Sequence, residues 1–161
     1  SLDGLQQIDE AVAKALSQFQ GDYISLKGLK QIDRIIVKVL SEFKVFKGKN
    51  LRLDGLQQID EVTAKALSQF QGECLSLDGL QQINEAVAKA LSQFQGNYLS
   101  LDGLQQINEA VAKALSQFQG ECLSLDLQQL DEGVAKALSQ FQGRINIAWE
   151  IKEQIQKYKK K

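Results

Sequence analysis

The stretch Ser76-Leu-Asp-Gly-Leu-Gln-Gln-Ile-Asn-Glu-Ala-Val-Ala-Lys-Ala-Leu-Ser-Gln-Phe-Gln-Gly96 occurs a second time, without a single change, from Ser100 to Gly120. Close copies begin at four other positions, so the start-to-start steps along the chain are 24, 27, 24, 24 and 24 residues. The six copies start at Ser1, Ser25, Arg52, Ser76, Ser100 and Ser124. A fixed period of this length is typical of solenoid proteins, in which each repeat buries its apolar face on its neighbours.

The first part of each repeat predicts a short strand. Around the start of the fifth copy, Leu99 and Leu101 alternate with more polar residues and so share one face of an extended segment. Asp102-Gly103 then predicts a turn. Because successive strands are joined by a helix, we expect them to be parallel, with a right-handed crossover. Strands stack about 4.8 Å apart and helices about 8–10 Å apart, so the stack should curve with its strands on the concave side.

The second part of each repeat predicts a helix. Asn108 stands where an N-cap is expected, Glu109 follows in the first turn, and apolar residues recur at helical spacing as far as Phe118. Gly120 is expected to end the helix as the residue after its C-cap. The predicted fold class is therefore α/β, a right-handed curved solenoid of strand–turn–helix repeats with a parallel sheet on the concave side.

The pattern Leu-x-Leu-x-Gly-Leu-x-x-Ile resembles the leucine-rich repeat of a helix-rich bacterial variety, and the resemblance covers nearly the whole chain. It implies a horseshoe-shaped solenoid and carries no particular ligand with it. The pattern departs from the consensus at two positions: the Asn/Cys position is held by leucines such as Leu80 and Leu104, and the first leucine position falls on glycines such as Gly96. The first departure excludes an asparagine ladder along the turns.

The repeats predict one domain with a C-terminal cap. Residues 1–143 comprise six leucine-rich-like repeats, and residues 144–161 a strand–helix cap. The repeat boundaries are 1–24, 25–51, 52–75, 76–99, 100–123 and 124–143. In the cap, Ile151 and Ile155 should point inward, while Trp149 and Tyr158 should cover the apolar edge of the last repeat, since terminal repeats need such a cover. The alternative is that Trp149 is a platform for a ligand.

The composition argues against several classes of function. The formal net charge is −1, so no overall field attracts nucleic acid or a membrane surface. No apolar run comes near the roughly 20 residues of a membrane span. The chain has no histidine, which removes the commonest general base and transition-metal ligand. We therefore expect no enzyme activity, no cofactor and no metal site.

The two cysteines, Cys74 and Cys122, occupy the same position in repeats that are two steps apart. Two strand spacings are about 9–10 Å, and a disulfide needs Cα atoms within about 7 Å, so both thiols are predicted to be free. Free thiols and the absence of a visible signal peptide favour the cytoplasm, with secretion as the open alternative.

Parallel strands in register would align equivalent residues in three rows on the concave face. The tyrosine–cysteine row contains Tyr23, Asn50, Cys74, Tyr98 and Cys122. The serine row contains Ser25, Arg52, Ser76, Ser100 and Ser124. The aspartate row contains Asp3, Lys27, Asp54, Asp78, Asp102 and Asp126. The serine row would be a shallow hydroxylated floor. The aspartate row could bind calcium or a basic partner; the alternative is that each carboxylate bonds the backbone of its own turn.

The second repeat differs most from the others. Between Lys27 and Arg52 there are eight basic and two acidic residues, and three residues are inserted around Lys44-Val45-Phe46-Lys47. These residues predict a basic edge for an acidic partner, centred on Lys44, Lys47, Lys49 and Arg52. The alternative is an extended helix followed by a solvated loop.

The predicted function is non-enzymatic protein–protein recognition through the concave strand face and the basic edge. The predicted contact residues are Tyr23, Lys44, Phe46, Lys47, Lys49, Arg52, Ser76, Asp78, Tyr98, Ser100 and Asp102. One alternative is a structural or surface protein that self-associates through an uncapped N-terminal end, and another is a calcium binder that uses the aspartate row. No nucleic-acid partner is expected, because no fingerprint of a nucleic-acid-binding module is present.

Overall fold

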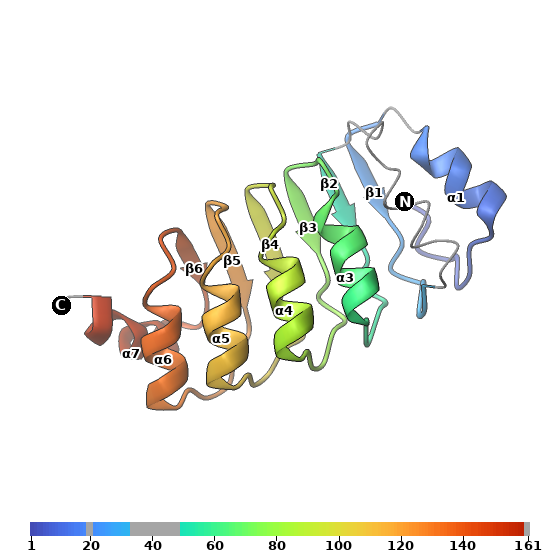
Figure 1. The fold of residues 1–161 in the computed structure, drawn as a ribbon. Helices are drawn as coiled ribbons and strands as arrows, with labels where there is room; N and C mark the ends of the chain where they lie inside the picture. Colours follow the sequence, from blue (N-terminus) through green and yellow to red (C-terminus); the bar gives the residue numbers. More distant parts are fainter. Residues whose placement is uncertain (19–20, 33–48, 160–161) are drawn as a thin grey trace.

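The computed structural model of the chain describes residues 1–18, 21–32 and 49–159. They form one six-stranded parallel sheet whose strands follow one another in chain order and alternate with helices (Figure 1). The strands are β1 (Tyr23–Ser25), β2 (Asn50–Arg52), β3 (Cys74–Ser76), β4 (Tyr98–Leu101), β5 (Cys122–Leu125) and β6 (Arg144–Asn146). The helices are α1 (Glu10–Ser17), α3 (Glu61–Ser68), α4 (Glu85–Leu91), α5 (Glu109–Leu115), α6 (Glu132–Leu138) and α7 (Trp149–Lys159). The α/β class and the parallel sheet are confirmed.

Equivalent residues of neighbouring repeats are paired across the whole sheet. Tyr98 lies between Cys74 on β3 and Cys122 on β5, and Leu99 is paired with Leu75. The two cysteines are thus separated by a strand, and both are free, as predicted. From α3 to α7 each helix contacts the next, and α3 to α6 form a row on one side of the sheet (Figure 1).

The helix of the fifth repeat begins where predicted but ends earlier. The side chain of Asn108 accepts a hydrogen bond from the backbone N–H three residues on, at 2.9 Å, so the N-cap is confirmed. The helix then ends at Leu115 and does not reach Phe118. The Ser116 hydroxyl donates to the carbonyl oxygen of Lys113 at 2.8 Å. This bond satisfies one of the last carbonyl groups of the helix with a side chain, which favours termination at this point.

Each of the helices α3 to α6 is followed by a phenylalanine, and these four rings form one continuous stack. Neighbouring ring centroids are 6.0–6.2 Å apart, and the ring planes are within 9° of parallel. The stack contains Phe70, Phe94, Phe118 and Phe141. A Cβ atom at Gly120 would lie 2.2 Å from the Phe118 ring and 2.6 Å from the carbonyl oxygen of Gly96. No described glycine has a positive φ, so Gly120 is not the left-handed helix terminator that we predicted. It is glycine because the ring and the neighbouring backbone fill the space of a side chain.

The Asp-Gly turns stack backbone on backbone. In the fourth repeat the N–H of Leu80 donates to the carbonyl oxygen of Leu77 at 3.1 Å, which confirms the predicted turn. A Cβ atom at Gly79 would lie 2.1 Å from the carbonyl oxygen of Asp54 and 2.6 Å from that of Leu56. The glycine is therefore required by the close approach of the preceding turn.

The C-terminal segment contains β6 and α7. Ile151 and Ile155 are buried, as predicted, and Tyr158 is half-buried. Trp149 is 65% exposed, so the prediction that it covers the last repeat is wrong. In an α-helix two residues correspond to a rotation of about 200°, which places Trp149 on the side of α7 opposite Ile151.

Gly133 lies inside α6, where the fourth and fifth repeats have alanine. A Cβ atom there would meet only the end of the Glu109 side chain, at 2.7 Å, and that flexible side chain can move. We expect Gly133→Ala to raise the free energy of unfolding by up to about 1 kcal/mol, because glycine is less favourable than alanine in a helix by about that amount. Urea unfolding measures the change, and lower stability in the variant would contradict this account of the site.

Candidate partner-binding face

One face of the sheet is covered by helices, and no described helix covers the other (Figure 1). Leu75 and Leu99 belong to the fully buried core. The residues that precede these leucines, Cys74 and Tyr98, are only half-buried, and the equivalent Tyr23 on β1 is 41% exposed. We call the uncovered surface, with its tyrosine–cysteine, serine and aspartate rows, the open face.

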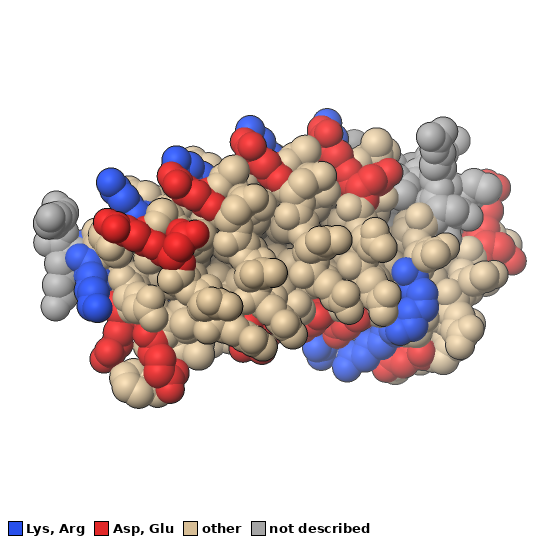
Figure 2. Space-filling model, turned by 90° about the horizontal axis from the view of Figure 1, so that it is seen from below, with Lys and Arg blue, Asp and Glu red and all other residues tan. Residues whose placement is uncertain are grey.

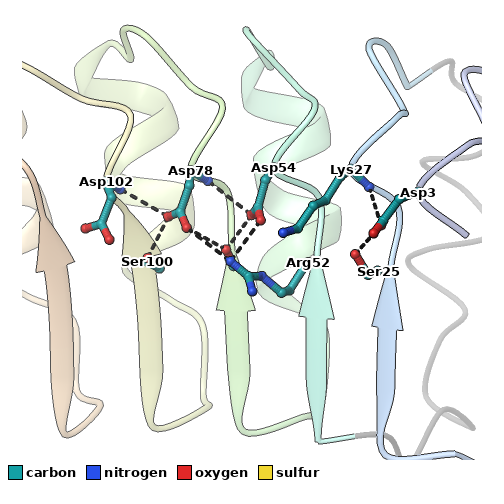
Figure 3. Close-up of polar contacts among 9 residues, drawn as sticks. Asp3, Ser25, Lys27, Arg52, Asp54, Asp78, Ser100 and Asp102 are labelled. Atoms are coloured by element: carbon teal, nitrogen blue, oxygen red, sulfur yellow. Dashed lines mark hydrogen bonds and ion pairs between the residues drawn. The ribbon is translucent and has the colours of Figure 1, made fainter. Parts of the chain in front are cut away.

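The serine row is an internal element and not an exposed floor. Ser76 and Ser100, which we predicted to contact a partner, are 3% and 4% exposed. The Ser100 hydroxyl donates to Asp78 at 2.6 Å (Figure 3). The Ser76 hydroxyl donates to Asp54 in the same way. These hydroxyl groups are therefore unavailable to a partner, and the prediction for the two serines is corrected.

The aspartate row joins each repeat to the next. Asp78 Oδ1 accepts hydrogen bonds from the Ser100 hydroxyl and from the backbone N–H of Asp102, the latter at 3.1 Å (Figure 3). Asp3 makes the same pair of bonds to Ser25 and to the N–H of Lys27, the latter at 3.2 Å. The backbone N–H that each of these carboxylates accepts belongs to the following repeat, so the alternative that each bonds the backbone of its own turn is wrong for them. Each also accepts a hydrogen bond from a hydroxyl of its own repeat, Asp78 Oδ2 from Ser76 at 3.0 Å and Asp3 from Ser1.

Ser100→Ala tests this junction. The substitution leaves Asp78 Oδ1 without its hydroxyl donor in a partly buried setting, and such a loss costs about 1–3 kcal/mol. We expect the free energy of unfolding in urea to fall by that amount. A stability equal to that of the parent chain would show that the Ser–Asp bonds contribute nothing to repeat cohesion.

Arg52 interrupts the serine row and bridges two carboxylates of the aspartate row. Its guanidinium group lies 3.0 Å from Asp54 and 3.7 Å from Asp78 (Figure 3). The Nε atom is buried and has no hydrogen-bond partner among the described residues. Arg52 thus neutralises carboxylates that would otherwise stand side by side, and it keeps a side chain that is 36% exposed on the open face.

The surroundings of the carboxylates differ along the aspartate row, and they shift the pKa of Asp3 and of Asp102 in opposite directions. Hydrogen bonds from Ser1, Ser25 and the N–H of Lys27 lower the pKa of Asp3 to about 2. Further along the row, burial raises the pKa of Asp102; a hydrogen bond from Ser124 opposes this, and the nearby carboxylates of the row add to the rise. The carboxylate at Asp102 is thus in a less favourable electrostatic setting than the one at Asp3.

The Cys74 thiol of the open face is not activated. Cys122 is buried, and burial raises the pKa of the half-buried Cys74 thiol, which disfavours the nucleophilic thiolate. The two thiols flank Tyr98 in the tyrosine–cysteine row.

The basic edge is described only in part. Lys44, Phe46 and Lys47 lie outside the described residues, so their predicted role stays a prediction. Lys49 is exposed, and its carbonyl oxygen accepts the N–H groups of Glu73 and Cys74 at 2.7 and 2.8 Å.

Our sequence-based contact set missed Lys27, which is exposed and stands in the aspartate row beside the strand of Arg52. The signal was present, because Lys27 replaces the aspartate found at this position in every other repeat. Figure 2 shows lysine and arginine side chains gathered on the surface beside the N-terminal strands.

The helix side offers a more uniform surface. Grooves lie between α3 and α4 and between α4 and α5, with alanines along them and an i,i+4 Glu–Lys ion pair on each helix. Val62 is the most exposed apolar residue there, at 61%. Because α3, α4 and α5 present the same ion pair, the surface of the helix side varies less from repeat to repeat than that of the open face.

Among the described residues, no three His, Cys, Asp or Glu side chains converge to hold a metal ion. Within the same ranges, no helix has the length and apolarity that a membrane crossing requires. Comparison of the chain with models of protein families, with curated proteins and with solved structures finds no match in any of the three.

Proposed function

We propose that the chain is a non-enzymatic binding module that recognises a protein partner through the open face. The observation that carries the proposal is where near-identical repeats differ. The core position of the strands is always leucine or isoleucine, whereas the neighbouring open-face position varies. At that position the six strands carry Tyr23, Asn50, Cys74, Tyr98, Cys122 and Arg144. Recognition of one partner needs such a non-uniform surface, while packing needs only the repeated one.

The proposed architecture is a curved, right-handed solenoid related to leucine-rich repeat proteins, with the open face on its concave side. The difference between strand spacing, about 4.8 Å, and helix spacing, about 8–10 Å, supports curvature in this direction. A concave face supports the binding proposal, because it lets several strands contact one partner.

The chemistry of the open face supports binding and not catalysis. The serine hydroxyls donate to carboxylates that also hold the next turn, so neither group is free to transfer a proton to a substrate. Nucleophilic catalysis requires an activating base or a lowered pKa, and the pKa of Cys74 is raised.

Cys74 provides a native probe for the test. Cys122→Ser leaves Cys74, on the open face, as the sole thiol, and peptides that bind the chain can be selected from a random display library. We expect the selected peptides to slow alkylation of Cys74 severalfold. The matched control carries Cys74→Ser, Cys122→Ser and Val62→Cys, which moves the single thiol to the exposed helix side.

The proposal requires that the control thiol keeps its alkylation rate when the same peptides are bound. Protection of the thiol at position 62 with no protection of Cys74 would place recognition on the helix side and overturn the proposed function.

A further inference from the structure

The open face has a division of charge between its two halves. On the N-terminal half, Lys27 and Arg52 are the residues that depart from the Asp and Ser of the other repeats, and Lys49 is exposed just before β2. On the C-terminal half, Asp102 is half-buried and Asp126 is exposed.

No described lysine or arginine is paired with the carboxylates of the acidic half. Arg52 bridges Asp54 and Asp78, whereas no ion pair to Asp102 or Asp126 is formed within residues 49–159. At the strand starts, Lys49 is followed by the exposed Glu73 and Glu121, but it is preceded by the exposed Asp22 before β1. Three groups run against the division of charge: Asp3 beside Lys27, Asp22 before β1, and Arg144 on β6.

We propose that the partner segment is a bipolar polypeptide, with acidic residues over Lys27 and Arg52 and basic residues over Asp102 and Asp126. This inference rests on the proposed function and names the chemistry of the partner. Both blocks are expected on one ligand, because Asp102 and Asp126 repel a polyanion such as nucleic acid, and the exposed Lys27 and Lys49 repel a purely basic segment at their positions. The order of charges, and not the net charge, is then the source of specificity.

The register sets the spacing between the two blocks. Lys27 follows β1 and Asp126 follows β5, so four strand spacings, roughly 19 Å, separate their positions in the row. The centre of the basic pair lies between β1 and β2 and that of the acidic pair between β4 and β5, three strand spacings or roughly 14 Å apart. An extended peptide rises about 3.3 Å per residue, so the centres of its acidic and basic blocks should be about four residues apart.

The probe is a fluorescent peptide of three glutamates, one uncharged residue and three lysines. Its control has the same composition with alternating charges. In fluorescence anisotropy at low salt we expect the block peptide to bind at least about fivefold more tightly, as several exposed ion pairs would give. The preference should shrink in high salt, because exposed charges are then screened.

Two variants of the chain locate the effect. Lys27→Asp with Arg52→Ser restores the residues of the other repeats, including the Ser–Asp pair that links them, and so removes the basic half with a fold-compatible change. Asp102→Asn with Asp126→Asn removes the acidic half and keeps the side-chain oxygen that Ser124 contacts. Each variant should abolish the preference for the block peptide.

The matched control for charge is Lys89→Glu with Lys113→Gln on the helix side, which changes the net charge as much as the first variant does. We expect it to keep the preference. Equal binding of the two peptides by the parent chain, or an equal loss in the helix-side control, would overturn the inference. A salt-sensitive dimer that competes with the block peptide would assign the face to a second copy and also overturn it.

The two proposals fail in distinguishable ways. Selected peptides that protect Cys74 but lack this order of charges would leave the proposed function standing and refute the bipolar partner. Selected peptides that leave Cys74 unprotected would refute both the proposed function and the bipolar partner.

Discussion

Gly79→Ala should lower the free energy of unfolding by about 3 kcal/mol or more. The added Cβ atom would lie 2.1 Å from the carbonyl oxygen of Asp54 and 2.6 Å from that of Leu56. Both obstacles are backbone atoms of the preceding turn, so relief requires the two repeats to move apart, and overpacking of a well-packed interior costs about 1–3 kcal/mol even where side chains can adjust. Urea unfolding followed by circular dichroism measures the change.

Gly4 offers a matched control for this prediction. It occupies the same position of an Asp-Gly turn, and a Cβ atom there would have nothing within 4 Å. Gly4→Ala should therefore change stability by no more than about 0.5 kcal/mol. A similar loss in both variants would mean that the turn itself requires glycine, and our explanation by stacking of neighbouring repeats would be wrong.

Phe118→Ala is the second substitution for which we expect a large effect. The ring is buried and stacks on Phe94 and Phe141, with centroids 6.2 and 6.0 Å away. Removal of a buried phenylalanine side chain costs about 3–5 kcal/mol, which includes the cavity it leaves. We expect a loss in this range, because the rings on both sides keep the gap from closing.

Two further variants separate burial from stacking. Phe118→Leu keeps most of the apolar volume and should cost about 1–2 kcal/mol, part of which is the lost aromatic pairs. Val62→Ala removes an apolar side chain that is exposed and should be nearly neutral. A cost below about 1 kcal/mol for Phe118→Ala would refute the stack as a main element of cohesion between repeats.

Much of this architecture could be predicted from the sequence because the same strand, turn and helix-cap residues recur in successive repeats. The alternation around Leu99 predicted a strand, Asp102-Gly103 a turn and Asn108 an N-cap, and all three are present. The in-register rows followed from parallel strands of equal spacing. The separation of the two free cysteines followed from the same argument.

The parts that could not be predicted depend on contacts between repeats. Helical periodicity placed Phe118 on the helix, but the ring stack and the Ser116 hydroxyl bond place it after the helix end. Gly120 was interpreted as a helix terminator. Helical periodicity does not reveal that the Phe118 ring and the carbonyl oxygen of Gly96, in the previous repeat, fill the space of a side chain at this position. Sequence patterns within one repeat do not show which atoms of the next repeat, about 24 residues away, will pack against them.

The candidate site shows the same limit. Equal spacing put Ser100 and Asp78 in adjacent rows, yet it did not show that the hydroxyl of one would be consumed by the carboxylate of the other. Equal spacing also placed Lys27 in the aspartate row, but it did not show that Lys27 stays exposed on the strand next to that of Arg52.

The most direct test of the account is a disulfide in the tyrosine–cysteine row. The open face exists only if residues 74, 98 and 122 lie side by side, with Tyr98 about 4.8 Å from each cysteine, within the Cα range of a disulfide. Under mild oxidation, mass spectrometry of the Tyr98→Cys monomer should find an intramolecular disulfide between position 98 and Cys74 or Cys122, whereas the parent monomer should form none. A Cys74–Cys122 disulfide in the parent monomer, or no disulfide at position 98 in the variant, would contradict the register and every row built on it.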